Sequence, residues 1–146
     1  MTTVPAPTEA ARPAAPVVWK YTLAAVVAGA VINVVIFVIA KLAGVSFLVP
    51  DPNNAAATLE VTAVNVIIAS VGPLLLGAIV AGLTVPRWSW ALPALQIVGG
   101  VLAVLSVASP LAVNADTGTK LVLALWHLVL GAVYVGALWQ SRKEAV

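Results

Sequence analysis

Four long stretches of this sequence contain no charged residue, and they constrain the fold more than any other feature. They run over Tyr21–Ala40, Val61–Pro86, Trp88–Ala115 and Leu121–Ser141. A helix needs about 20 apolar residues to cross a hydrocarbon core about 30 Å thick, so each stretch suffices for one crossing and none suffices for two. In lipid the backbone polar groups need partners within the segment, so each crossing is expected to be a helix. The sequence therefore predicts an all-α fold, a polytopic membrane protein built as a four-transmembrane-helix bundle.

The composition excludes several other classes of protein. Of 146 residues, 62% are hydrophobic and 8% are charged, against about 25% charged in a typical soluble domain. A soluble domain of this size cannot cover so much apolar surface. There is no cysteine, which excludes a disulfide framework and thiolate catalysis. The net charge of +2 is too small for a protein that binds nucleic acid.

Turn-forming and charged residues divide the chain. We expect a disordered tail over residues 1–17, because its proline, alanine and threonine cannot build a core. The four-helix transmembrane domain follows over residues 18–141, and residues 142–146 form the C-terminus. Within the loop after the first helix, Pro50–Asn54 predicts a turn, and Val45–Val49 is apolar enough to dip into the membrane interface. The helices are predicted over about 18–43, 60–85, 90–109 and 117–140.

The distribution of positive charge predicts the orientation. One side receives the N-terminal tail, the loop between the second and third helices, and the C-terminus. That side collects five of the seven basic residues, Arg12, Lys20, Arg87, Arg142 and Lys143, whereas the other side has Lys41 and Lys120. By the positive-inside rule both termini are predicted to be cytoplasmic, in a multi-pass protein of the cell (inner) membrane. The same helix ends carry the interfacial aromatic residues Trp19, Tyr21, Trp88, Trp90 and Trp139.

The last helix has a stripe of polar residues. Asp116, Lys120, His127 and Tyr134 are spaced 4, 7 and 7 residues apart, which places them on one helix face. Asp116 and Lys120 form either an i, i+4 ion pair or an interfacial cap beside a snorkelling lysine. His127 lies about 10 Å deeper than Lys120. It is either a neutral imidazole bonded to a neighbouring helix or a group that relays protons or binds a ligand.

Other polar residues lie on small-residue faces of the first three helices. They are expected either to bond across close helix contacts or to line a polar cluster between the helices, open to the extracytoplasmic side. Glu60 lies near the level of Lys120, so it is either paired with that lysine or solvated. Pro73 frees a backbone acceptor in the second helix and is expected to kink it. The expected cluster contains Asn33, Asn65, Gln96, Ser106, Lys120, His127 and Tyr134.

One set of short motifs resembles a known family. The chain resembles an uncharacterised family of small actinobacterial membrane proteins with four predicted spans, a domain of unknown function. The resemblance implies the four-helix topology and marks suspect positions, but the family has no established activity. It would cover residues 19–139 and is carried by Asn33, Ser109-Pro110-Leu111, Asp116-Thr117, Thr119-Lys120-Leu121 and His127.

Two functions are consistent with these features. The first is a non-catalytic ligand-binding, permeation or accessory module that self-associates in the bilayer and takes a hydrophobic small-molecule ligand. The alternative is a membrane enzyme, an isomerase, cyclase or hydrolase of a lipid-like substrate. In that case His127 would work as acid or base with Asp116 or Glu60 as its carboxylate partner. One histidine and no cysteine are too few for a closed zinc site, so neither a metal nor a cofactor is expected.

Overall fold

The computed structural model describes residues 12–144. Four of its helical segments are long and apolar enough to cross a membrane, and they run over Ala15–Leu42, Ala63–Thr84, Ala91–Ala112 and Thr117–Lys143. The predicted four-helix transmembrane fold is therefore confirmed. Residues 1–11 of the tail predicted over 1–17 lie outside the described residues. Residues 15–17, which the prediction assigns to the tail, belong to the first helix, because that helix begins at Ala15 with a proline in its first turn.

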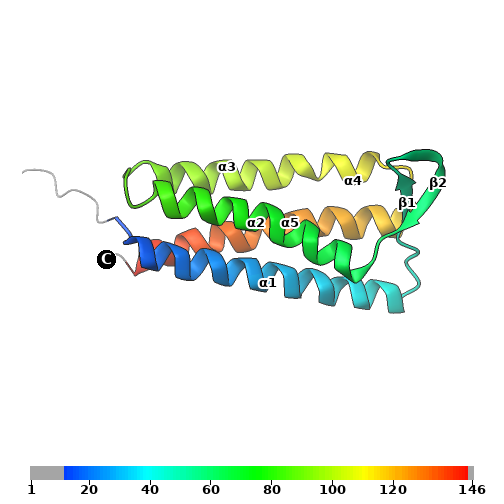
Figure 1. Cartoon of the computed structure of the whole chain (residues 1–146), viewed down its shortest axis with the longest axis horizontal. Coiled ribbons are helices and arrows are strands. Elements are labelled where there is room, and N and C mark those ends of the chain that lie inside the picture. The colour runs from blue at the N-terminus through cyan, green and yellow to red at the C-terminus, as the bar shows by residue number, and fades with distance from the viewer. Residues whose placement is uncertain (1–11, 145–146) are drawn as a thin grey trace, which may run out of the picture.

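The elements follow in the order of four spans and one hairpin. Helix α1 (Ala15–Leu42) leads to strands β1 (Leu48–Asp51) and β2 (Asn54–Glu60). Helix α2 (Ala63–Thr84) returns, and the third span consists of α3 (Ala91–Ser106) and α4 (Ala108–Ala112). Helix α5 (Thr117–Lys143) closes the bundle. Figure 1 shows the helices side by side, with both ends of the described chain at what we call the terminal end and the strands at the hairpin end.

The third span is broken where the sequence predicts one continuous helix over about 90–109. The break falls between Ser106 and Ala108. Pro110 has no N–H to donate to the carbonyl of Ser106, four residues earlier, which weakens the helix at this point. The two parts still make one span of the membrane.

The structure has a β-hairpin where the sequence predicts only a loop with a turn. Strands β1 and β2 pair antiparallel, from Leu48 opposite Glu60 to Asp51 opposite Asn54, with an irregularity after Pro50. The Asp51 side chain accepts a bond of 2.8 Å from the Asn53 amide, a local bond that stabilises the turn. The hairpin holds the chain between α1 and α2 close to the end of the bundle.

The helices do not pack equally well against one another. Helix α1 packs extensively on α2 and α5, and α3 packs on α5, whereas α2 makes few contacts with α3 although a short loop joins them. The bundle is therefore open along the side between α2 and α3. Small residues make the close contacts: a Cβ at Gly131 would lie 2.1 Å from the Cβ of Ala103. In lipid, where no hydrophobic force drives helices together, such close packing contributes much of the association.

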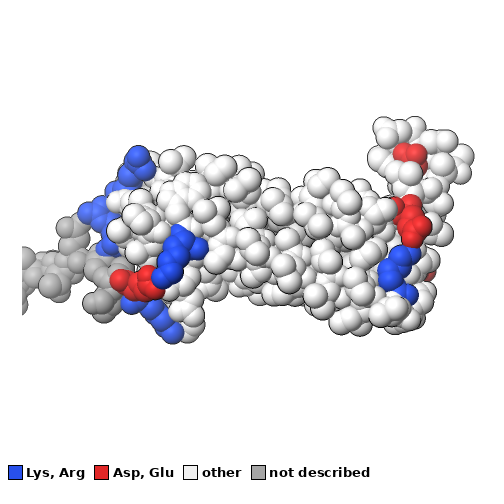
Figure 2. All heavy atoms as spheres, turned by 60° about the horizontal axis from the view of Figure 1, so that its bottom comes forward, with Lys and Arg blue, Asp and Glu red and all other residues white. Residues whose placement is uncertain are grey.

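The charged side chains lie at the two ends of the bundle. Figure 2 shows them at both ends of the face in view, with an uncharged band between them. Two ion pairs occur among residues 12–144: Lys20 with Glu144 at 2.9 Å near the terminal end, and Lys41 with Glu60 near the hairpin end. Bonds from the Tyr21 hydroxyl and from Lys20 lower the pKa of the Glu144 carboxyl. Polar ends and an apolar middle are the arrangement that a bilayer requires.

Candidate functional site

A groove lies where α2 and α3 fail to meet. Its volume is about 540 Å³, within the range of about 300–1,000 Å³ for small-molecule sites. It extends along α2 from Ala69 to Val80, so it is about 16 Å long and lies within the membrane span. We call it the lateral groove. Its lining residues are Asn33, Ala69, Ser70, Pro73, Leu74, Leu76, Gly77, Val80, Leu95, Val98, Gly99, Leu102, Ala103, Ser106, Trp126, His127, Leu130, Gly131 and Tyr134.

The Tyr134 ring lies between α2 and α3. A Cβ at Gly77 of α2 would lie 2.8 Å from the Tyr134 ring, and one at Gly99 of α3 would lie 2.7 Å from it. The ring of this α5 residue is therefore wedged between two glycines, and its hydroxyl donates to the Gly77 carbonyl at 3.2 Å. Because the glycines lack side chains, the ring fits without displacing either helix. The groove opens beside this wedge.

Two buried polar atoms on the groove lining have no hydrogen-bond partner among the described residues. The Asn33 side chain is 1% exposed and donates to the Ser70 hydroxyl oxygen at 3.0 Å, but its Oδ1 accepts nothing. Trp126 is 6% exposed, and its Nε1–H donates to nothing. An orphaned buried polar group costs about 1–3 kcal/mol. Both residues line the lateral groove, but the two atoms themselves are covered by protein, so a hydrogen-bonding partner reaches them from the groove only when neighbouring side chains shift.

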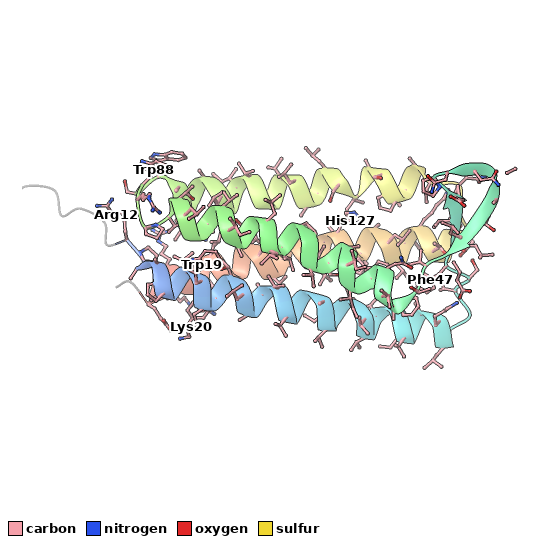
Figure 3. The ribbon with its side chains drawn as sticks, viewed as in Figure 1. Arg12, Trp19, Lys20, Phe47, Trp88 and His127 are labelled. Atoms are coloured by element: carbon pink, nitrogen blue, oxygen red, sulfur yellow. The ribbon has the colours of Figure 1, made fainter. Side chains whose placement is uncertain are left out.

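His127 also lines this part of the groove. Its Nδ1 lies 2.7 Å from the Leu123 carbonyl oxygen, one turn earlier in α5. Because a carbonyl oxygen only accepts, Nδ1 carries the hydrogen, and in the neutral ring Nε2 is then an acceptor. Figure 3 shows His127 about halfway along the bundle. The bond to its own helix differs from the predicted bond to a neighbouring helix.

The proline of α2 supplies one further acceptor. Pro73 lies inside the helix and has no N–H, so the Ala69 carbonyl loses its usual intrahelical donor. Both residues line the lateral groove. The backbone acceptor that Pro73 is predicted to free therefore belongs to a residue of the groove lining.

A second polar cluster lies at the hairpin end, and its members are fully bonded to one another. Asp116 caps α5 by accepting from the Thr119 amide at 3.0 Å, and it also accepts from the Ser46 hydroxyl at 2.6 Å. Thr119 in turn accepts from the Phe47 amide at 3.0 Å and donates to Asp116. We call Ser46, Phe47, Asp116 and Thr119 the hairpin clasp.

The clasp holds Phe47 in an unusual conformation. Its φ is 57°, in the left-handed region that residues other than glycine rarely occupy. Its carbonyl accepts from the Val61 amide at 2.9 Å, so both backbone groups are bonded. The ring is fully buried, stacked on Trp126 at 5.8 Å and tilted against Phe37 at 4.8 Å. Phe47 thus closes the hairpin end of the bundle and helps to fix Trp126.

Hydrogen bonds lower the pKa of the Asp116 carboxyl to about 2, first the bond from the Ser46 hydroxyl and then those from Thr119. The charged form is favoured because all of these groups donate to it. This is the cap that one reading of the sequence predicted. The alternative, an Asp116–Lys120 ion pair, is not among the ion pairs of the described residues. The predicted pairing of Glu60 with Lys120 is wrong, because Glu60 pairs with Lys41. Its side chain is exposed, as the solvated reading expects.

The structure divides the predicted polar cluster. Asn33, Ser106, His127 and Tyr134 line the lateral groove, although the Ser106 hydroxyl donates to the Ala103 carbonyl at 2.9 Å. Three members do not line it. Asn65 forms a capping box with Thr62 at the start of α2, Lys120 lies in the first turn of α5, and Gln96 lies on α3 outside the lining.

Sequence reasoning missed two groove residues whose side chains can form hydrogen bonds, Ser70 and Trp126. Ser70 is small and common in membrane helices, so it gives no signal by itself. Trp126 does give one: it lies in the middle of its span, whereas Trp19, Trp88 and Trp139 lie near helix ends. A tryptophan far from the interface needs a partner for its N–H.

The comparisons with known proteins show the family of this chain and no specific function. Among residues 12–144 no group of three or more His, Cys, Asp or Glu side chains could hold a metal ion. A comparison with curated proteins and one with solved structures found no match. The model of DUF6069, a family of unknown function, matches residues 13–144. Because that match includes all four spans, the hairpin clasp and the lateral groove, the chain belongs to the DUF6069 family.

Proposed function

We propose that this membrane protein is a non-catalytic binding module for a hydrophobic small molecule, which enters the lateral groove from the lipid between α2 and α3. The observation that carries the proposal is the groove itself, an apolar space lined by two residues, Asn33 and Trp126, that each have an unpartnered polar atom. None of the described residues that line it is Lys, Arg, Asp or Glu. An uncharged ligand dissolved in the bilayer matches this chemistry, because a few polar groups on an apolar wall orient such a ligand.

The groove supports binding better than catalysis. An acid–base reaction at His127 needs a second group within hydrogen-bond reach of the substrate. Asp116 precedes His127 by 11 residues in the sequence, so it lies roughly 16 Å away along α5. Glu60 is paired with Lys41, and neither carboxylate lines the groove. An isomerase, cyclase or hydrolase mechanism using these residues therefore has little support.

The groove also gives little support for permeation within one chain. It extends over about 16 Å of α2, against a hydrocarbon core of about 30 Å. The stacked rings of Phe47 and Trp126 lie toward the hairpin end, where a path would have to continue. Self-association stays a prediction. So does the orientation, with both termini cytoplasmic in the cell membrane, for which the excess of basic residues at the terminal end is the support.

Filling the groove tests the proposal. Ala69→Phe adds a ring to the lining on α2, whereas Ala28→Phe adds the same ring to an exposed position of α1 that does not line the groove. The full chain in nanodiscs is titrated with a brominated long-chain alcohol, a quencher of tryptophan fluorescence. Wild type and Ala28→Phe should show saturable quenching that is absent in Trp126→Phe, and Ala69→Phe should lose it. Quenching that never saturates in the wild type would refute a binding site.

A further inference from the structure

We infer that the ligand of the lateral groove carries a single uncharged hydroxyl head group, bound between Asn33 and Trp126, with its hydrocarbon chain extending toward Tyr134. This inference rests on the proposed function and names the class of ligand: long-chain alcohols. It follows from the uneven distribution of polar atoms along the groove.

The polar groups gather at one level of the membrane. Ser70 is seven residues into α2, and Trp126 is nine residues into α5, so both lie about 10–14 Å from the helix ends at the hairpin side. Asn33 bonds directly to Ser70, which places it at the same level, and His127 follows Trp126. Toward the terminal end the lining consists of apolar residues and Tyr134, whose hydroxyl is already bonded. The groove therefore has a polar half and an apolar half.

The unpartnered atoms define what the head group must do. Trp126 Nε1–H needs an acceptor, and Asn33 Oδ1 needs a donor. A hydroxyl group provides both from one oxygen atom. An ether or a ketone accepts from Trp126 and leaves Asn33 without a donor, and a hydrocarbon satisfies neither.

Charge excludes the commoner lipid head groups. A phosphate or carboxylate in this half of the groove would meet no Lys or Arg side chain, and burying an unpaired anion is costly. An ammonium group would meet no carboxylate, and burying an unpaired cation is costly in the same way. His127, with Nδ1 bonded to Leu123, offers a second acceptor for a hydroxyl and needs no charge to do so.

A ligand series on the wild-type chain tests the inference without any variant that could misfold. Hexadecanol, its methyl ether and hexadecane share one chain and differ in the head group. Their affinities for the chain in nanodiscs are measured by competition against tritiated hexadecanol. We expect hexadecanol to bind about fivefold more tightly than the ether, and the ether about fivefold more tightly than hexadecane, since each step removes one hydrogen bond.

Two variants then locate the head group. Trp126→Phe keeps an aromatic ring and loses the N–H, so it should reduce hexadecanol affinity about fivefold and leave hexadecane unchanged. Gln96→Leu, a polar-to-apolar change on α3 outside the groove, is the matched control and should change neither.

The outcomes separate the inference from the proposed function. Equal affinities for the three compounds would overturn the hydroxyl inference, with water occupying the polar half, and would leave binding in the groove intact. Tighter binding of palmitate or hexadecylamine than of hexadecanol would also overturn it. The proposed function fails as well if none of these compounds competes in the wild type, or if Ala69→Phe does not weaken their binding.

Discussion

The hairpin clasp and the lateral groove both take polar side chains from α5, only a few turns apart, and they use them in opposite ways. In the clasp, Asp116 and Thr119 satisfy each other and the backbone of Phe47. On the groove lining, Trp126 and Asn33 each keep one buried polar atom, Nε1 and Oδ1, without a partner among the described residues. Fully bonded polar groups rigidify a structure, whereas unbonded ones cost free energy unless something else binds them. The difference separates structural polar residues from candidate functional ones.

The largest effect is expected where the clasp meets the aromatic cluster. Phe47→Ala removes a fully buried ring that contacts Phe37 and Trp126. We expect the free energy of unfolding to fall by about 3 kcal/mol, as for other buried phenylalanines. Titration with a denaturing detergent, followed by circular dichroism, measures this loss. An unchanged unfolding curve would mean that the clasp does not stabilise the bundle.

A smaller loss should follow from breaking the clasp's hydrogen bonds alone. Thr119→Val keeps the shape of this fully buried residue and removes the oxygen that accepts from the Phe47 amide. Leaving that amide unpaired should cost about 2 kcal/mol in the same assay. Thr117→Val, at the exposed neighbouring position, is the control and should have little effect.

The clasp should also make stability depend on acid pH. The folded pKa of Asp116, about 2, is below its ordinary value of 3.8. The charged carboxylate therefore stabilises the fold above about pH 4, and this contribution is lost as the pH falls toward 2. Melting temperatures measured from pH 5 to pH 2 should drop for the wild type by more than for Asp116→Asn, which can still cap the helix. Parallel curves for the two proteins would contradict this role.

The smallest effect on stability is expected in the groove. Asn33→Leu removes a side chain that is bonded on one side and orphaned on the other. Because Ser70 can turn its hydroxyl to its own helix backbone, the free energy of unfolding should change by less than about 1 kcal/mol. Binding of hexadecanol should nevertheless weaken. A loss of stability as large as that of Thr119→Val would mean that Asn33 is structural, and the comparison would fail.

The residues that carry the family resemblance fall on both sides of this comparison. Asp116 and Thr119, which carry part of the resemblance, are clasp residues. His127 and Asn33, which carry another part, line the groove. The sequence identifies all four as unusual, because polar residues stand out against apolar helices. It cannot separate the two groups, since that depends on which partners the fold brings to them.

The sequence by itself determined the four spans, because hydropathy is a local property and each apolar stretch has the length of one membrane crossing. It also determined the broken hydrogen bond at Pro73, which depends on residues within one helical turn, and it gave the cap at Asp116 as one of two readings. The tertiary structure alone decided the hairpin, the pairing of Glu60 with Lys41, and the lateral groove. Helical phase shows which residues share a face but not which helix that face meets. The groove opens beside the Tyr134 ring of α5, which lies between Gly77 of α2 and Gly99 of α3, a contact among three helices that no single segment encodes.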